Sequence, residues 1–365
     1  MKRFALTAAA AALAGTVGFA GTASAETELV IVSWGGAYSA SQQGAYHDPY
    51  MANNADIKIV NDDSANEAVA KLRAMNEAGN VTWDLVDVVA ADAIRLCDEG
   101  LAEPINHDAV LAAAPDGTPA SKDFGDLIVS ECFIPQIVYS TTFGYRTDLV
   151  KKAPTSVCDV FDVEGIPGKR SLEKNPINNV EWALICDGVD PSQVYDVLGT
   201  PEGVERALKK LGTIKDHVVW WTKGAQTPQL LADGEVVIGS TYNGRLFSVI
   251  EEEKQPVAML WDWQVFDLDG WIVPTGTKNK DAVLKYLNFA TDTQRLADQA
   301  KFISYGPARA SSAPLVGKHA SLGIDMAPHM PTDPNNAKTT LLYNYEFWAD
   351  NRDDIDERFQ AWLLQ

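Results

Sequence analysis

The chain has 365 residues, of which 46% are hydrophobic, and its formal net charge at pH 7 is −20. A chain of this length and apolar content can bury substantial cores, so the composition excludes intrinsic disorder and favours two domains. The large negative charge disfavours binding to nucleic acid or to anionic lipid, because like charges repel.

The first 25 residues have the three parts of a secretory signal peptide. "MKR" is basic, "FALTAAAAALAGTVGFA" is apolar, and "GTASA" ends in the small-x-small pattern of a signal peptidase site. We therefore predict cleavage after Ala25, which leaves an exported mature chain of 340 residues (365 − 25). A retained membrane anchor is the alternative interpretation of this segment.

Strand-like and helix-like segments alternate between residues 28 and 100. Strands are expected at 29–34, 56–62 and 83–89, and helices at 39–48, 64–79 and 90–100. The first helix should stop before Pro49, and the residues from Trp34 to Tyr38 should form a turn. Two glycines in that turn would let the backbone approach a ligand closely. The βαβαβα order predicts a parallel sheet with helices on both faces.

The pattern changes after residue 132. Strand-like runs at 134–140 and 142–145 indicate a crossing between two lobes, and a second α/β unit follows. Its helices are expected at 203–215 and 227–235, and its strand at 236–244. Residues 270–300 should form a strand, a turn and one long helix. The acidic run at 350–359 is interpreted as the solvated face of a helix.

Four cysteines in an exported protein favour disulfides over free thiols. Three connectivities are open. We predict that neighbours along the chain pair, which gives Cys97–Cys132 and Cys158–Cys186. Buried unpaired cysteines are the alternative, and the lack of a C-x-x-C pair argues against a redox or zinc role.

The sequence offers little catalytic chemistry and many aromatic residues. Five histidines lack metal-ligand spacing, and no nucleophile motif such as G-x-S-x-G occurs, so we expect no metal, no cofactor and no enzymatic activity. Several tryptophans and tyrosines follow predicted strands and lie beside Gly, Asn or Asp. Ligands bind at such strand ends in open α/β sheets, and aromatic faces with carboxylates form a cage for an amine.

An ordered set of segments carries a resemblance over most of the chain. They are "SWGGAY", "WDLVDVVAADAIRLCDEGLAEPI", "YSTTFGYRTD", "GAQTPQLLADGEVVIGSTYNGR", "DLDGWIVPTGTKNKDAVLKYLNFA", "SYGPAR" and "EFWADNRDDIDERFQAWL". The chain resembles the periplasmic solute-binding proteins of ABC importers, in the spermidine/putrescine group and closest to its γ-aminobutyrate-type branch. The resemblance implies an α/β fold of two lobes, two hinge crossings and a ligand cleft between the lobes. Residues 26–142 plus 270–315 would form the first lobe, and 143–269 plus 316–365 the second.

The resemblance also implies the ligand contacts. Asp269 would hold a ligand amine, and the aromatic contacts would come from Trp34, Tyr38, Tyr242, Tyr305 and, near the cleft rim, Trp348. Polyamine binders carry acids where this chain has Asn178 and Asn179, which weakens the case for a second amine. Arg245 would suit a ligand carboxylate if it faces the cleft, and a structural ion pair is the alternative.

We therefore predict a periplasmic, monomeric binding component that captures a small amine and delivers it to an ABC importer permease. The ligand is expected to be a γ-aminobutyrate-like zwitterion or a short polyamine such as putrescine or spermidine. Two alternatives stay open. The same fold could bind a phosphonate or another anion, and the runner-up from a different class is a secreted hydrolase. Hinges are expected near 141–145 and 266–270, where Gly144 and Gly270 permit backbone rotation.

Overall fold

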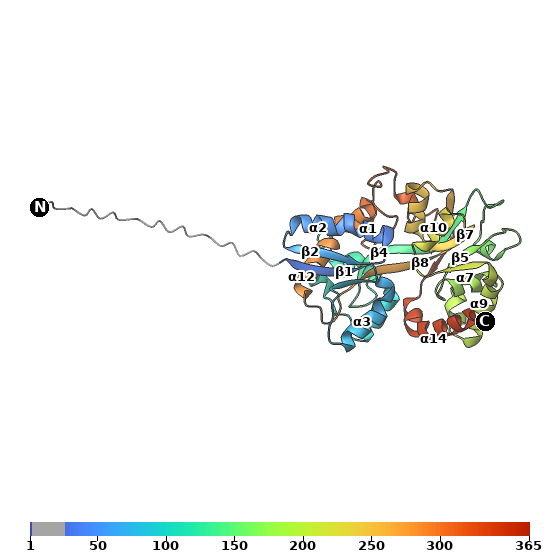
Figure 1. Cartoon of the computed structure of the whole chain (residues 1–365), viewed down its shortest axis with the longest axis horizontal. Helices are drawn as coiled ribbons and strands as arrows, with labels where there is room; N and C mark the ends of the chain where they lie inside the picture. The colour runs from blue at the N-terminus through green and yellow to red at the C-terminus, as the bar shows by residue number, and fades with distance from the viewer. Residues whose placement is uncertain (2–25) are drawn as a thin grey trace.

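A computed structural model describes residue 1 and residues 26–365. Figure 1 shows two groups of helices around one sheet, whose long central strands run from one group to the other. Within the described residues no helix is long and apolar enough to span a membrane. The predicted signal segment, apart from Met1, lies outside the described residues, so its cleavage stays a prediction.

The sheet is mixed and has ten strands in the order β2-β1-β3-β8-β4-β7-β5-β6, with β9 beside β4 and β10 beside β8. Strands β1, β2 and β3 are parallel to one another, as are β5, β6 and β7. Strands β4 and β8 are antiparallel to each other and to their neighbours β7 and β3. The strands are β1 (Thr27–Val32), β2 (Ile57–Asp62), β3 (Leu85–Val89), β4 (Ile134–Arg146), β5 (Arg170–Glu173), β6 (Val218–Trp221), β7 (Ile238–Tyr242), β8 (Val257–Ile272), β9 (Gly306–Pro307) and β10 (Thr340–Leu342).

The first lobe is built on β1, β2 and β3, in the predicted alternation of strands and helices. Its helices are α1 (Gly36–Gln42), α2 (Asp48–Asn53), α3 (Ala68–Glu77), α4 (Ala90–Asp98), α5 (His107–Val110), α6 (Ala120–Phe124), α12 (Lys280–Ala290) and α13 (Thr293–Gln299). The sequence placed Tyr38 in a turn, but only residues 33–35 are irregular there and Tyr38 lies in α1.

Two further predicted boundaries in the first lobe were wrong. The first helical region continues through a π-helical turn to Asn53, because Pro49 lies in the first turn of α2, where no proline N–H is needed. The long helix expected before residue 300 is two helices. Asp292 accepts a hydrogen bond from the backbone N–H of Gln294 and so caps α13 as a new helix.

The second lobe is built on β5, β6 and β7. Its helices are α7 (Asn179–Cys186), α8 (Val194–Leu198), α9 (Pro201–Gly212), α10 (Gln226–Ala232), α11 (Asn243–Phe247) and α14 (Tyr345–Leu363). Its core contains the fully buried rings of Trp348 and Phe359 from α14 and Trp182 from α7. The last helix therefore belongs to this lobe by packing, although it lies far along the chain from α7.

Strands β4 and β8 connect the lobes. They have 13 and 16 residues, so each is long enough to contribute to both lobes. The sequence suggested a break near residue 141, and β4 is instead continuous. Its register with β8 does shift at this point, since Thr141 pairs with Val265 whereas Phe143 pairs with Leu260. The two hinges and the residue limits of the lobes stay predictions.

Both predicted disulfides are present. Cys97 at the end of α4 is bonded to Cys132, and Cys158 is bonded to Cys186 at the end of α7. Each bond joins elements of a single lobe. Closing loops with sequence separations of 35 and 28 residues stabilises a fold by roughly 3–4 kcal/mol per bond through the unfolded chain.

The acidic run in α14 is not simply a solvated face. Arg352 donates a 2.5 Å hydrogen bond to Asp92 of α4, and Arg95 of α4 pairs with Asp353. These ion pairs join a helix of the second lobe to a helix of the first. The lobes therefore touch at this side of the cleft.

Candidate functional site

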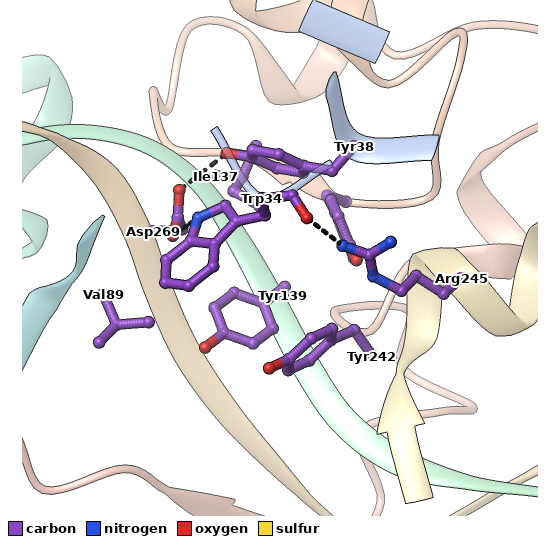
Figure 2. A pocket seen from close by; sticks show the side chains of 9 residues that line it. Trp34, Tyr38, Val89, Ile137, Tyr139, Tyr242, Arg245 and Asp269 are labelled. Carbon is purple, nitrogen blue, oxygen red and sulfur yellow. Dashed lines mark hydrogen bonds between the residues drawn. The ribbon is translucent and has the colours of Figure 1, made fainter. Parts of the chain in front are cut away.

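Nine side chains surround a small apolar cavity of about 30 Å³, which we call the aromatic pocket (Figure 2). They come from both lobes and are Trp34, Tyr38, Val89, Ile137, Tyr139, Tyr242, Arg245, Asp269 and Tyr305. This volume admits one or two water-sized groups. With the lobes in this position, the pocket can hold one end of a ligand rather than a large molecule.

The turn after β1 brings the first lobe to the pocket. Gly35 and Gly36 have positive φ values of 74° and 60°, which side chains rarely adopt. A Cβ on Gly36 would also lie 3.0 Å from Nη1 of Arg245. The two glycines therefore let the chain turn directly from β1 into α1 and let Arg245 come close to the backbone. Trp34 and Tyr38 lie on either side of this turn.

The second lobe reaches the pocket through the "YNG" segment at the end of β7. A Cβ on Gly244 would lie 2.6 Å from ring atoms of Tyr305, so only glycine permits this approach. Asn243 next to it donates a hydrogen bond to the carbonyl of Ser304 over 2.6 Å. These contacts place Tyr242 and Arg245 opposite the residues of the first lobe.

Asp269 is the buried acid of the pocket, with an exposed fraction of 3%. It accepts hydrogen bonds from Nε1 of Trp34 over 2.7 Å and from the hydroxyl of Tyr38 over 2.8 Å (Figure 2). Burial first, and then the nearby carboxyl of Asp87, raise the pKa of Asp269 well above its usual range. A cationic ligand would reverse this effect by favouring the charged form.

Asp87 lies behind the pocket and is fully buried. Its two oxygens accept from Nε2 of Gln42 over 3.1 and 2.9 Å. The hydroxyl of Tyr38 also lies 2.7 Å from Oε1 of Gln136, which Gln42 contacts in turn. This polar network holds Tyr38, and with it Asp269, in a defined orientation.

Arg245 is the buried base of the pocket. Its Nη2 donates to the backbone carbonyl of Trp34 over 3.2 Å, and its guanidinium lies 5.8 Å from the ring centre of Tyr242. Its Nε is buried and has no hydrogen-bond partner among the described residues. The structural ion pair considered from the sequence is also absent from that part of the chain. The guanidinium therefore keeps donor capacity toward the pocket.

Six of the seven residues expected from the resemblance line this pocket, namely Trp34, Tyr38, Tyr242, Arg245, Asp269 and Tyr305. Trp348 does not. Its indole is fully buried in the core of the second lobe and donates to Oε1 of Glu181 over 2.8 Å. It was expected near the cleft rim and lies in that core instead. Glu181 accepts this hydrogen bond in the core and lines neither cavity.

Sequence reasoning missed Tyr139, Val89 and Ile137. Tyr139 is the pocket residue with the clearest chemistry, because its hydroxyl donates to Asp267 over 2.7 Å and its ring meets that of Tyr242 edge-on. The only signal for Tyr139 was its place at the start of the "YSTTFGYRTD" segment, which contributes to the resemblance. The two aliphatic residues looked like ordinary strand residues.

A larger cavity of about 400 Å³, the polar chamber, adjoins the aromatic pocket. Four side chains line both cavities: Trp34, Val89, Tyr139 and Tyr242. Asn178 lines the chamber, whereas the side chain of Asn179 turns away and donates to the carbonyls of Glu173 and Asn175. The cleft therefore contains two adjacent cavities.

Comparisons with known proteins agree with this architecture. Residues 45–332 match the model of the family described as bacterial extracellular solute-binding protein. The chain belongs to this family. It is 35% identical over 348 residues to the gamma-aminobutyric acid-binding protein of Pseudomonas aeruginosa, covering 95% of this chain and 94% of that protein. The family confirms the expected binding protein of two lobes.

Two further relatives are informative. The spermidine/putrescine-binding periplasmic protein of Escherichia coli K12 is 24% identical over 205 residues, which are 55% of this chain and 57% of that protein. The solved structure of a GABA receptor is 33% identical and superposes with a TM-score of 0.77, covering 92% of this chain and 98% of that chain. The solved receptor therefore shares the fold of this protein over nearly its whole length, whereas the E. coli relative matches about half of it.

Proposed function

We propose that this protein captures a γ-aminobutyrate-like zwitterion in the periplasm and presents it to the permease of an ABC importer. The observation that carries the proposal is that one buried acid, Asp269, and one buried base, Arg245, line the same aromatic pocket. The names of the P. aeruginosa relative and of the solved GABA receptor support the same ligand class.

Asp269 would bind the ammonium group. Its carboxylate already accepts two neutral hydrogen bonds, and an ammonium adds a charge-assisted one. The rings of Tyr139, Tyr242 and Tyr305 line the same cavity and supply faces that attract a cation. Such an arrangement replaces the water that the ammonium loses on entry.

Arg245 would bind the ligand carboxylate. Its planar guanidinium suits a carboxylate better than a lysine would, because it offers parallel donors. Arg245 and Tyr242 belong to the second lobe and Asp269 lies on the crossing strand β8, so the space between the two charges depends on how far the lobes close. A zwitterion with the matching separation would be held between both lobes and would stabilise the closed form.

Isothermal titration calorimetry of the full mature protein tests this proposal. We expect γ-aminobutyrate to bind more tightly than putrescine or spermidine, since a second ammonium would face Arg245. Methylphosphonate, which represents the anion alternative, should not bind. Tight binding of putrescine with no binding of γ-aminobutyrate would contradict the zwitterion and favour a polyamine, the ligand class named for the E. coli relative.

Delivery to a permease predicts a change of shape on binding. Small-angle scattering should show a smaller radius of gyration with a saturating ligand, because rotation at β4 and β8 closes the cleft. An unchanged radius would argue against a closing cleft. The same measurement gives the molecular mass and therefore tests the predicted monomer.

A further inference from the structure

Two buried acids lie on adjacent strands beside the aromatic pocket. Asp87 of β3 and Asp269 of β8 are 0% and 3% exposed. Val89 pairs with Asp269 and Asp87 pairs with Trp271, so the two acids are diagonal neighbours on one face of the sheet. Within residues 26–365 neither acid forms an ion pair with a basic side chain. Two buried carboxylates without a cation repel each other, and a proton on one of them removes the repulsion.

A chain of hydrogen bonds fixes the orientation of the amides around this pair. It starts at a backbone carbonyl, which can only accept. The hydroxyl of Ser41 donates to the carbonyl of Tyr38 over 2.7 Å and therefore accepts from Nε2 of Gln299 over 3.1 Å. Oε1 of Gln299 must then be an acceptor, and Nε2 of Gln136 donates to it over 3.3 Å. Oε1 of Gln136 is therefore the atom that faces the hydroxyl of Tyr38.

The hydroxyl of Tyr38 has one proton and two oxygen neighbours. It lies 2.7 Å from Oε1 of Gln136 and 2.8 Å from Oδ1 of Asp269. Both distances are typical of O–H···O hydrogen bonds, and each such bond needs a proton of its own. Because the oxygen of Gln136 has no proton to give, Tyr38 donates to it. The contact with Asp269 is then a hydrogen bond only when Asp269 is a neutral acid that donates to Tyr38.

The neighbouring acids favour the same protonation state. Burial first, then the carboxyl of Asp87, and to a smaller extent Asp267 on the same strand raise the pKa of Asp269. The hydrogen bonds from Tyr38 and Trp34 act in the opposite direction and do not outweigh these effects. Geometry and electrostatics thus agree that the ligand-free pocket holds a proton on Asp269.

The other charged and titratable groups of the pocket do not replace this proton. Arg245 is the only basic residue that lines the pocket in the described chain, and it donates to the carbonyl of Trp34 without forming an ion pair with Asp269. Burial raises the pKa of each of the remaining hydroxyls, so they stay protonated, and they belong to Tyr139, Tyr242 and Tyr305.

We propose that Asp269 carries a proton in the ligand-free protein and that capture of an amine releases this proton. The ligand enters as an ammonium. The O–H bond of the Asp269 carboxyl breaks, its proton passes to water, and the carboxylate left behind pairs with the ammonium. The hydroxyl of Tyr38 turns from Gln136 to the new carboxylate, which also keeps its hydrogen bond from Trp34.

Asp87 is a positioning residue in this exchange. It does not line the pocket, and its carboxyl acts on the ligand only through Asp269. The inference rests on the proposed function, because it assumes an amine at Asp269, and it adds that capture depends on pH. Since an ammonium replaces a proton, affinity should rise up to tenfold per pH unit while Asp269 is protonated in the free protein. Affinity should become constant once Asp269 is already ionised.

Calorimetry in two buffers of different ionisation enthalpy counts the proton. We would titrate γ-aminobutyrate into the full mature protein at about pH 6, once in cacodylate and once in MES, neither of which is a primary amine. The difference between the two heats gives the number of protons released, and we expect about one per ligand. Equal heats in both buffers would overturn the inference and leave the proposed function intact. Failure of γ-aminobutyrate to bind would overturn the proposed function itself.

Two buried acids provide a variant and its matched control. Asp87→Asn removes the neighbouring charge and keeps an oxygen that accepts from Gln42. It should reduce both the proton count and the slope of affinity against pH to less than half of the wild-type values. Glu181→Gln is the control, because Glu181 is also a buried acid with a pKa raised to about 7 and lines neither cavity. The control should keep the wild-type slope. An unchanged slope in Asp87→Asn would overturn the role of Asp87, whereas a merely structural role would lower affinity equally at every pH.

Carbon-13 NMR of the ligand-free protein observes the proton without relying on binding. Aspartate carboxyl carbons are labelled, and loss of one signal in Asp269→Asn assigns Asp269. If that variant does not fold, the aspartate signal of the wild type that responds most to γ-aminobutyrate gives the assignment. We expect the chemical shift of a neutral carboxyl at about pH 6 and that of a carboxylate after γ-aminobutyrate is added. The shift of a carboxylate in the ligand-free protein at this pH would overturn the inference.

Discussion

The aromatic pocket and the polar chamber share four side chains and are built in opposite ways. In the pocket the acid is held by two hydrogen bonds and surrounded by rings, and little volume is left. Three buried polar atoms of the residues that line the chamber have no hydrogen-bond partner in the part of the chain that the structure describes, and the chamber is more than ten times larger, about 400 against about 30 Å³. The difference shows that most of the space in the cleft lies in the chamber, whereas the pocket is nearly filled by its own side chains.

The largest effect should come from the acid of the pocket. Asp269→Ala is expected to lower the binding affinity for every amine ligand by at least about a thousandfold, because an ammonium in the cleft would lose its charged partner. Calorimetry with γ-aminobutyrate and putrescine measures the loss. Asp267→Asn is a useful comparison, since Asp267 lines the chamber rather than the pocket. If Asp269→Ala still binds amines, the aromatic pocket is not the site that binds the ammonium group.

A residue that lines neither cavity should affect stability and not ligand choice. Burial raises the pKa of Glu181 to about 7, so in the folded protein this group favours its protonated form. The protonated Glu181 side chain is fully compatible with the folded state below the pKa that this group has in the unfolded chain. As the pH rises from that value through about 7, the free energy of unfolding falls, because the buried group must ionise. The loss amounts to about 3 kcal/mol at high pH.

Glu181→Gln should therefore raise the melting temperature at pH 8.5 and leave it unchanged at pH 4, as measured by scanning calorimetry. Glu205→Gln on the exposed face of α9 is the control and should have no effect at either pH. If Glu181→Gln changes the affinity for one ligand relative to another, Glu181 influences the ligand site and is not only a residue of the core.

The base of the pocket should give an intermediate and selective effect. Arg245→Met is expected to weaken γ-aminobutyrate about thirtyfold, or about 2 kcal/mol, and to leave putrescine unchanged or improved, because only the former has a carboxylate. Titration calorimetry of both ligands provides the test. If the affinities for both ligands fall equally, Arg245 stabilises the fold of the pocket and does not bind the ligand carboxylate.

The smallest effect should come from the chamber rim. Asp92→Asn removes the charge that pairs with Arg352 between α4 and α14. Partly exposed ion pairs contribute about 0–1 kcal/mol, so affinity should fall no more than about fivefold and equally for all ligands. The loss should shrink in 1 M salt. Asp353→Asn is the matched control, because this carboxylate is 78% exposed in its pair with Arg95. Selective loss of one ligand in Asp92→Asn would show direct contact instead.

Much of the fold followed from local patterns. The alternation of strands and helices between residues 28 and 100 and the neighbouring cysteine pairs were predicted, and the structure confirms them. The predicted helix limits were wrong where one side chain decides them, as at Pro49 and Asp292. A single cap or a proline in a first turn changes the local energy little, so pattern reasoning does not detect it reliably.

The resemblance identified six pocket residues because they follow strand ends in recognisable motifs. It failed for Trp348, since an aromatic in a helix can face a cleft or a core without changing the local sequence pattern. It also missed Tyr139. The position of Tyr139 depends on the pairing of β4 with β8, in which Tyr139 lies opposite Asp267, a residue 128 positions later in the chain. Pairing at that distance has no local signal.

By itself the sequence determined the α/β character, the cysteine pairing, the glycine turn and the aromatic residues that follow the strands, because these depend on short-range patterns of side chains. Only the tertiary structure decided that Arg245 faces Trp34 without a carboxylate partner in the described chain, that Trp348 lies in a core, and that a larger polar chamber adjoins the pocket. Each of these depends on surfaces from two lobes meeting, and the shape between two surfaces is set by their packing rather than by either segment alone.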